Sequence, residues 1–394
     1  MNMLLFLTTF FLLYGGMHLY AFLKARAAIA FGTGASICIG LFMLTMVFAP
    51  LFVWFTERLE FEIPARFISY IGYAWMGIIF LFFSISLCID IYHLFVHLTG
   101  GLFNKDLSAI IIRVRIAFYI PLLLSVSIAI YGYFEAQNIR TEKVVIKTTK
   151  IPEEIGILRI VQISDVHLGL TIRARRLQII LEEVKKAEPD ILVSTGDLVD
   201  GQRCGIRGLS SPFGEINPKY GKFAVTGNHE FYAGIGYSLE FTEKAGFRVL
   251  RGEGVTVADI INIAGIDDPT GKSYGLSNDI SERKLLLALP QDKFTLLLKH
   301  RPVVDKDSLG LFDLQLSGHT HKGQIFPFSL LTWLYYRHTL HAGHLRLVND
   351  SYLYVSRGAG TWGPPIRFLS PPEITVIELV HEDRLLKTSH YQVL

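Results

Sequence analysis

Histidine, aspartate and asparagine side chains recur at five short turns in the second half of the chain. Each turn follows a short apolar run of the kind that forms β-strands. Carboxylate, imidazole and amide groups without a thiolate suit divalent ions such as Mn, Fe, Zn or Mg. The residue types therefore predict a metal site made from Ser164-Asp165-Val166-His167, Gly196-Asp197, Gly227-Asn228-His229-Glu230, His300 and Gly318-His319-Thr320-His321.

Any one of these turns alone carries little information, because short Asp and His patterns occur by chance and single histidines are common in cores and on surfaces. Five such turns together are different, because buried His, Asp and Asn side chains are too costly to collect without a partner. Two ions about 3.5–4 Å apart, bridged by one carboxylate, can clamp an in-line displacement at phosphorus. We therefore expect a two-metal hydrolytic centre.

The elements that must position these turns are the apolar runs before them. From about residue 141, β-rich runs alternate with helical stretches and with Gly- or Asp-rich turns, which is typical of an α/β domain. Open α/β sheets place their sites at the carboxyl ends of strands. The runs that carry the turns are 157–163, 191–195, 223–226, 294–299 and 314–316.

The order of the motifs resembles that of the calcineurin-like metallophosphoesterases, over residues 140–394. Longer stretches look like the bacterial branch of the YkuE and YaeI phosphodiesterases, and the transmembrane protein with a metallophosphoesterase domain has a similar layout. These stretches are Pro189-Asp190, Gly196-Asp197-Leu198-Val199-Asp200, Gly265-Ile266-Asp267-Asp268, Lys299-His300-Arg301-Pro302, His321-Lys322-Gly323-Gln324 and Pro372-Glu373-Ile374.

The resemblance implies a fold and a set of roles. The fold is a pair of facing β-sheets flanked by helices. His229 would lie just outside the metals and either orient the phosphate or protonate the leaving oxygen. Two departures from the family pattern remove no ligand: Glu230 stands where Asp is commoner, and Lys322 where Gly is frequent. One metal would be held by Asp165, His167, Asp197 and His321, and the other by the bridging Asp197 with Asn228, His300 and His319.

The first part of the chain has a different composition. Of the 394 residues, 51% are hydrophobic, and most of that excess lies before residue 136. A membrane helix needs about 20 mostly apolar residues, and four stretches qualify: 3–22, 29–54, 67–92 and 115–134. We expect a transmembrane helical region over 1–136 and a metallophosphoesterase domain over 137–394. The first stretch is interpreted as a retained helix, because its basic residues follow the apolar run.

The orientation of the spans depends on where Lys and Arg lie, since both favour the cytoplasm. The loops 23–28 and 97–114 carry more net basic charge than the loop 55–66. This pattern predicts an extracytoplasmic catalytic domain, although basic residues within 140–147 favour the opposite. Asp90, His93 and His97 share one helical face near the end of the third stretch, where they are either hydrated at the interface or form a proton or metal site.

Composition also excludes some classes. A net charge of +3 is too small to indicate a nucleic-acid partner, because binding the phosphate backbone needs many Lys and Arg side chains. The three cysteines, Cys38, Cys88 and Cys204, allow no disulfide framework or zinc motif.

Two segments after the last motif are ambiguous. The apolar and aromatic run 326–336, followed by Arg337, suits a membrane interface, but it would equally complete the core or dock on the anchor. His338, His341 and His344 are spaced by three. We expect them in a solvated or substrate-facing loop, with a third metal site as the alternative.

Together these patterns predict a membrane-anchored, binuclear-metal phosphoesterase, with manganese among the candidate metals. Its substrate would be a phosphodiester or pyrophosphate that is membrane-associated or lipid-linked. The alternatives are a pyrophosphate hydrolase of the UDP-diacylglucosamine type, a metal-free interaction scaffold on the same fold, and a channel or transporter with a regulatory domain. The oligomeric state stays open.

Overall fold

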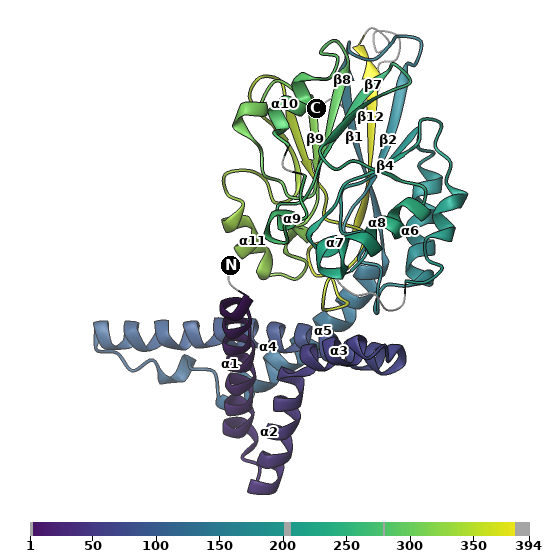
Figure 1. The fold of residues 1–394 in the computed structure, drawn as a ribbon. Coiled ribbons are helices and arrows are strands. Elements are labelled where there is room, and N and C mark those ends of the chain that lie inside the picture. Colours follow the sequence, from purple (N-terminus) through teal and green to yellow (C-terminus); the bar gives the residue numbers. More distant parts are fainter. Residues whose placement is uncertain (1–2, 201–205, 279, 383–394) are drawn as a thin grey trace. The chain divides into compact units, whose positions relative to one another are not determined.

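The computed structural model describes residues 3–200, 206–278 and 280–382 (Figure 1). Contacts between Cα atoms divide the chain into two compact units. Unit 1 comprises Met1–Phe134 with Gly363–Ile366, and unit 2 comprises Glu135–Trp362 with Arg367–Leu394. Cys204 lies outside the described residues.

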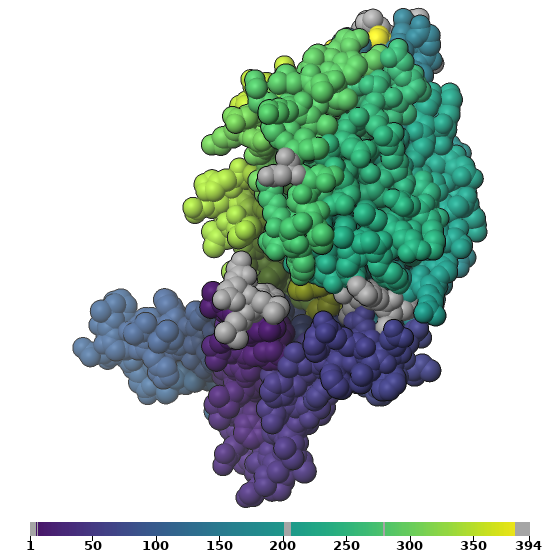
Figure 2. All heavy atoms as spheres, in the orientation of Figure 1, coloured from purple at the N-terminus to yellow at the C-terminus, as the bar shows by residue number. Residues whose placement is uncertain are grey.

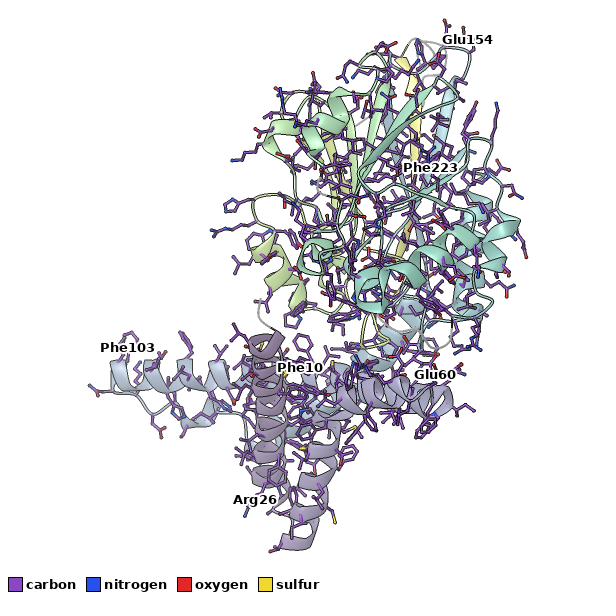
Figure 3. The ribbon with its side chains drawn as sticks, viewed as in Figure 1. Phe10, Arg26, Glu60, Phe103, Glu154 and Phe223 are labelled. Atoms are coloured by element: carbon purple, nitrogen blue, oxygen red, sulfur yellow. The ribbon has the colours of Figure 1, made fainter. Side chains whose placement is uncertain are left out.

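Unit 1 is built from helices. Its core joins Tyr14 of α1, Ile79 and Phe82 of α4, and Phe118 of α5. Most other large apolar side chains of these helices point outward (Figure 3). The elements are α1 (Met3–Ile29), α2 (Thr33–Val47), α3 (Ala49–Arg58), α4 (Glu62–Phe103), η1 (Ser108–Ile110) and α5 (Val114–Gln137).

Two helical segments of the described chain are long and apolar enough to cross a membrane, Glu62–Phe103 and Ser108–Gln137. The expected span 29–54 is instead the pair α2 and α3, bent by 51°, which makes a third candidate if the pair forms one span. The break precedes Pro50, in the first turn of α3, where proline lacks the N–H that a continuous helix needs. The structure therefore supports two or three of the four expected spans.

Unit 2 contains two six-stranded sheets, with strand orders β1-β12-β2-β3-β4-β5 and β10-β11-β9-β8-β7-β6. Both are mixed, because β12 runs antiparallel to β2 and β10 antiparallel to β11. The strands are β1 (Arg140–Thr148), β2 (Ile157–Ile163), β3 (Ile191–Ser194), β4 (Lys222–Ala224), β5 (Arg248–Val249), β6 (Glu253–Val257), β7 (Ile261–Ile266), β8 (Phe294–Lys299), β9 (Leu314–Ser317), β10 (Gly343–Arg346), β11 (Tyr352–Val355) and β12 (Glu373–His381).

The two sheets face each other across one core. Ile160 of β2 packs in the same cluster as Leu296 of β8 and Leu316 of β9. Because side chains alternate along a strand, Val161 of β2 faces the other way, into a cluster with Ile180 of α6 (Ala174–Lys186). The expected pair of facing sheets flanked by helices is confirmed for this unit.

Parallel pairing sets where the loops lie. Strands β2, β3 and β4 are parallel neighbours, as are β7, β8 and β9. Their carboxyl ends therefore meet at one edge of each sheet, where the motif turns follow. The remaining elements are η2 (Ser211–Glu215), α7 (Asn228–Ala233), α8 (Ile235–Lys244), α9 (Thr270–Ser273), α10 (Glu282–Leu287), η3 (Lys306–Ser308), η4 (His321–Gly323) and α11 (Phe328–Tyr335).

Candidate metal centre

The turns that follow β2 and β9 bring together the first group of candidate ligands. Asp165, His167 and His321 are buried, and each offers a ligand atom within 4.8 Å of the others. The two imidazole Nε2 atoms of His167 and His321 are 3.1 Å apart. Nε2 of His321 lies 3.4 Å from Oδ1 of Asp165.

The second group surrounds Asp197, after β3. Nε2 of His300 lies 3.2 Å from Oδ2 of Asp197 and 3.2 Å from the amide oxygen of Asn228. Nδ1 of His319 lies 3.0 Å from the same His300 nitrogen. Asp197 also approaches the first group, since its Oδ2 is 3.8 Å from Nε2 of His167. All seven candidate ligands thus converge, with Asp197 between the two groups.

The donor set fits divalent cations. Imidazole nitrogens carry lone pairs, and two of them only about 3 Å apart repel each other unless a proton or a cation lies between. Among the carboxylates, burial raises the pKa of Asp165, whereas Asp197 is charged. Burial opposes ionisation of Asp197, but His300 and His229 hold the pKa of its carboxyl well below the usual range. Burial and the neighbouring His300 charge lower the pKa of His319 to about 3, so its imidazole is neutral. Burial disfavours the imidazolium of His300, but the carboxylates of Asp197 and Asp165 raise its pKa to about 10, so a cation bound there would have to displace a proton.

The backbone at the site is strained. Five candidate ligands have positive φ, which costs a non-glycine residue about 1–3 kcal/mol and persists only where the surroundings enforce it. Neighbouring glycines allow the close approach that enforces it. A Cβ at Gly227 would lie 2.2 Å from Oδ1 of Asp197, and one at Gly318 would lie 1.9 Å from Oγ of Ser164. The φ values are 51° at Asp165, 53° at His167, 51° at Asp197, 71° at His319 and 48° at His321.

Glu230 holds two of the motif turns together. Its buried carboxylate accepts hydrogen bonds from the backbone N–H groups of Gly227 (2.6 Å), Asp197 (3.0 Å), Leu198 (2.8 Å) and Val199 (3.3 Å). Burial and the Asp197 charge raise the pKa of Glu230, and the donating backbone groups oppose that rise. The acid at this motif position therefore fixes loop geometry and is not one of the clustered candidate ligands.

His229 is buried beside both groups, and its partner was missed from the sequence. Nδ1 of His229 is 2.9 Å from Oδ1 of Asp200, which is also 3.6 Å from Nδ1 of His167. Burial disfavours the imidazolium, but the carboxylates of Asp197 and Asp200 raise the pKa of His229 to about 9. The signal for Asp200 was its place in the Gly-Asp-Leu-Val-Asp stretch, three residues after Asp197.

Arg367 is a second residue that the sequence did not indicate. It is fully buried, and its Nη2 lies 3.1 Å from Nδ1 of His321. Its guanidinium also donates to the carbonyl groups of Arg357 (2.8 Å), Gly358 (3.2 Å) and Gly360 (3.1 Å from Nε). Arg367 therefore ties the loop after β11 to the ring of a candidate ligand. No local motif marks it, because its partner is 46 residues away.

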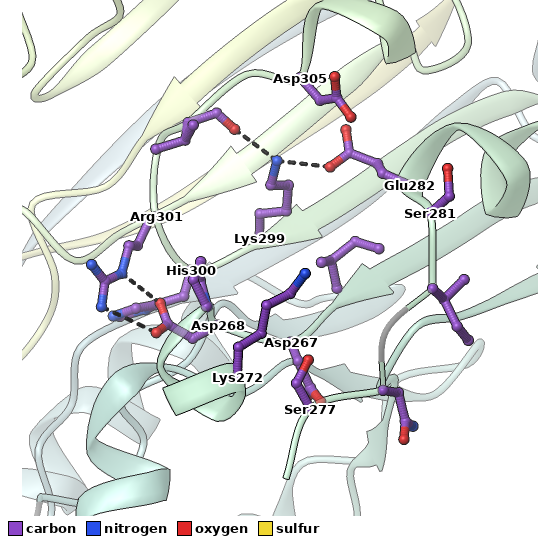
Figure 4. A pocket seen from close by; sticks show the side chains of 15 residues that line it. Asp267, Asp268, Lys272, Ser277, Ser281, Glu282, Lys299, His300, Arg301 and Asp305 are labelled. Carbon is purple, nitrogen blue, oxygen red and sulfur yellow. Dashed lines mark hydrogen bonds and ion pairs between the residues drawn. The ribbon is translucent and has the colours of Figure 1, made fainter. Parts of the chain in front are cut away.

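The rim of the site is aromatic on one side and charged on the other. The rings of Tyr232 and Trp362 lie 5.3 and 6.0 Å from that of His229, and both are about half exposed. Beside His300 is a pocket of about 520 Å³ (Figure 4). Arg301 and Lys272 line this pocket, and the guanidinium of Arg301 makes a two-point contact with Asp268 (2.7 and 3.1 Å).

Other residues singled out from the sequence lie elsewhere. Among the described residues, the groups of clustered metal-binding side chains include none of His338, His341 and His344. In unit 1, Asp90 accepts a hydrogen bond from Tyr20 (2.6 Å) and pairs with Lys24. A structural ion pair therefore accounts for Asp90.

Comparisons with known proteins agree with this geometry. A model of the calcineurin-like phosphoesterases matches residues 158–323. A metallophosphoesterase of Aquifex aeolicus is 40% identical over 260 residues, 66% of this chain and 98% of that protein. The transmembrane protein with metallophosphoesterase domain of Danio rerio is 33% identical over 272 residues, 66% of this chain and 62% of that protein. The metallophosphoesterase YkuE of Bacillus subtilis is 32% identical over 264 residues, 63% of this chain and 89% of that protein.

Proposed function

Since the chain belongs to the calcineurin-like metallophosphoesterase family, it is a metal-dependent phosphoester hydrolase, and we propose a substrate for it. The proposed substrate is a phosphodiester or pyrophosphate that is membrane-associated or lipid-linked. The observation that carries the hydrolytic part of this proposal is the position of Asp197. One carboxylate contacts both groups of candidate ligands, as a bridge between two cations must.

The proposed ligand sets follow the two groups. Asp165, His167 and His321 would hold one ion with Asp197, and Asn228, His300 and His319 would hold the other with the same carboxylate. When bound, such ions supply Lewis acidity toward phosphoryl oxygens and lower the pKa of water. The strained turns keep the ligand atoms in place beforehand, so little reorganisation is needed when substrate binds.

His229 is proposed as the group that contacts the phosphate or protonates the leaving oxygen. Asp200 accepts a hydrogen bond from Nδ1 of His229, which fixes the orientation of the ring. Nε2 is then the nitrogen that would contact the phosphate or the leaving oxygen. Asp200 also favours the imidazolium, so His229 has a proton to give. Asp200 is therefore a positioning residue that acts through His229.

The pocket beside His300 supports a polar substrate group next to the scissile ester. Its volume of about 520 Å³ falls within the usual range for small-molecule sites. Its wall carries charges of both signs (Figure 4): Lys272, Lys299 and Arg301 lie with Asp267, Asp268, Glu282 and Asp305. Arg301 pairs with Asp268 and Lys299 with Glu282. We propose that this pocket receives the polar portion of the substrate, while Tyr232 and Trp362 contact an apolar or planar portion near His229.

We further propose that residues 1–136 anchor the chain as a multi-pass region, with four spans and lipid contacts, and that residues 137–394 form the catalytic domain. The outward-facing apolar side chains of α4 and α5 support the anchorage. The basic loops 23–28 and 97–114 favour an extracytoplasmic catalytic domain. A pyrophosphate hydrolase of the UDP-diacylglucosamine type is the alternative if that domain proves cytoplasmic, because nucleotide-linked precursors are made there.

The decisive test is Asp197→Asn in the purified full-length protein, with Mn supplied and a soluble aryl phosphodiester as probe. We expect hydrolysis to be abolished while the protein stays folded, because the variant weakens the only shared ligand. The matched control is Asp259→Asn, at an exposed carboxylate paired with Lys293, which should keep wild-type turnover. Near wild-type turnover in Asp197→Asn would exclude the two-metal proposal. A folded wild type that neither binds metal nor hydrolyses the probe would favour the metal-free scaffold.

A further inference from the structure

The helix α11, in the catalytic unit, has its faces reversed relative to an ordinary surface helix. Its inward side carries the hydroxyl residues Ser329 and Thr332, and Thr332 is the buried residue of the helix. Its outward side is apolar, whereas helices of soluble domains turn that side inward. The outward side chains and their exposed fractions are Phe328 49%, Leu330 55%, Leu331 60%, Trp333 55%, Leu334 52% and Tyr335 78%.

This reversed helix is attached closely to the metal-binding turn. A Cβ at Gly323, which ends η4, would lie 2.4 Å from Cα of Ser329, so the two backbones are in direct contact. The N–H of Phe328 donates to the carbonyl of Ile325 (2.8 Å). His321, a proposed ligand, begins the same η4. The helix that carries the apolar face is therefore fixed to the turn that holds a proposed ligand (it belongs to the yellow-green region at the left of the catalytic unit in Figure 2).

Soluble proteins rarely expose a contiguous apolar patch of this kind unless it binds a partner. The chemistry of the patch fits a lipid surface. Trp333 and Tyr335 are the aromatic types that concentrate at membrane interfaces, and the leucine side chains of the helix suit the acyl boundary. The exposed Arg337, just after the helix, is placed for lipid phosphates.

The chain itself keeps a bilayer within reach. Only Asn138 and Ile139 separate the end of α5, a candidate span, from the first strand of the catalytic unit. Three residue steps extend at most about 11 Å. With α5 spanning the bilayer, this short link keeps the catalytic unit close to the membrane surface. An apolar face on that unit therefore has lipid within reach at all times.

We propose that α11 is a membrane-docking helix, whose outward apolar face lies in the headgroup–acyl boundary of the bilayer that anchors the chain. The inference rests on the proposed anchorage and adds a second, independent membrane contact made by the catalytic unit. Because α11 packs directly on η4, docking would hold the metal centre at the level of lipid headgroups. The proposed substrate class is thereby narrowed to phosphoesters whose phosphate lies at the bilayer surface.

The test uses the native tryptophan of the helix. A full-length variant with Trp54, Trp75 and Trp362 replaced by Phe keeps Trp333 alone. It is reconstituted into nanodiscs of phosphatidylcholine and phosphatidylglycerol, with or without bromine on the acyl chains. We expect brominated lipid to remove about half or more of the Trp333 emission, as for a side chain 5–10 Å into the boundary. Iodide in the water should quench it poorly.

A matched control places the single tryptophan elsewhere on the catalytic unit. Ile157→Trp, with Trp333→Phe added, puts it at an apolar position that is 43% exposed and begins β2, at the opposite end of that strand from the metal-binding turn. This tryptophan should be quenched by iodide and not by bromine. A Trp333 that iodide quenches and bromine does not would overturn the proposal. A Trp333 shielded from both would also overturn it, because protein would then cover the face.

This readout does not depend on catalysis. Loss of the proposed function would appear as an inactive wild type, with Trp333 of the single-tryptophan variant still quenched by brominated lipid. Failure of the docking inference would appear as an active wild type, with Trp333 of the single-tryptophan variant exposed to iodide or covered by protein. The two failures are therefore distinguishable.

Discussion

Replacing Glu230 by Gln tests whether this buried acid organises the metal-binding turns. The change is isosteric, but an amide offers one acceptor oxygen and one donor nitrogen. The carboxylate receives Gly227 and Asp197 on one oxygen and Leu198 and Val199 on the other. Whichever way the amide is oriented, two backbone N–H groups will face an NH2 group and lose their acceptor.

The magnitude follows from that count. An unsatisfied buried donor costs about 1–3 kcal/mol, so two cost about 2–6 kcal/mol. This is a large part of the roughly 5–15 kcal/mol that stabilises a typical domain. For a unit of this size, each kcal/mol lowers the unfolding midpoint by about 2–4 °C. We expect the midpoint of the catalytic unit to fall by roughly 4–24 °C, with a loss of turnover because the Asp197 turn loosens.

The assay is thermal unfolding of the full-length protein in detergent at pH 8, with metal content and aryl phosphodiester turnover measured on the same samples. Glu230→Asp keeps a carboxylate, so it should retain more stability than Glu230→Gln. Glu240→Gln, at an exposed acid paired with Lys244, should change nothing measurable. If Glu230→Gln unfolds within about a degree of wild type and turns over normally, the carboxylate does not hold the turns.

Three further outcomes are expected. His229→Ala should lower turnover by roughly 10²–10⁴-fold with metal content unchanged, and a missing ion in that variant would make His229 a ligand. Asp200→Asn should also lower turnover. In the double variant it should add little to the effect of His229→Ala, because both changes affect one imidazole ring. Chelation should lower the unfolding midpoint, and added Mn should restore it. At a hundredfold excess over Kd, bound Mn should add about 2.7 kcal/mol to the free energy of unfolding. An unchanged midpoint on chelation would argue against a preformed metal site. Glu154 is exposed on the catalytic unit (Figure 3). Glu154→Cys, with the three native cysteines replaced by Ser, should react with an impermeant thiol reagent on intact cells. Reaction only after lysis would place that unit in the cytoplasm.

Much of the catalytic unit was predictable because its signals are local. A short apolar run followed by a polar turn is visible in consecutive residues, as in Ile157–Ile163 before Asp165. Parallel strands bring their carboxyl ends to one edge, so the proximity of the motif turns followed from the strand assignments. Asp200 was within reach of the same reasoning, because it lies on the Asp197 turn.

The number of spans was less predictable from hydropathy. A hydropathy average over a window of residues does not show where a helix bends. The expected span 29–54 is divided into two helices at Pro50. Polar partners inside the helical unit were also invisible. Asp90 lies 66 residues from Lys24, and only packing of α1 against α4 brings the two side chains together.

The sequence by itself determined the family, the chemistry of the donor set and the strands that carry it, since each depends on residue types at short spacing. Tertiary structure alone decided how the turns are held and which side chains face outward. Glu230 reaches the backbone of Asp197 across 33 residues, and Arg367 reaches His321 across 46. The run 326–336 is equally apolar in either orientation, so only its packing against Gly323 shows that its apolar side faces away from the core. Such contacts join distant parts of the chain, and no local pattern encodes them.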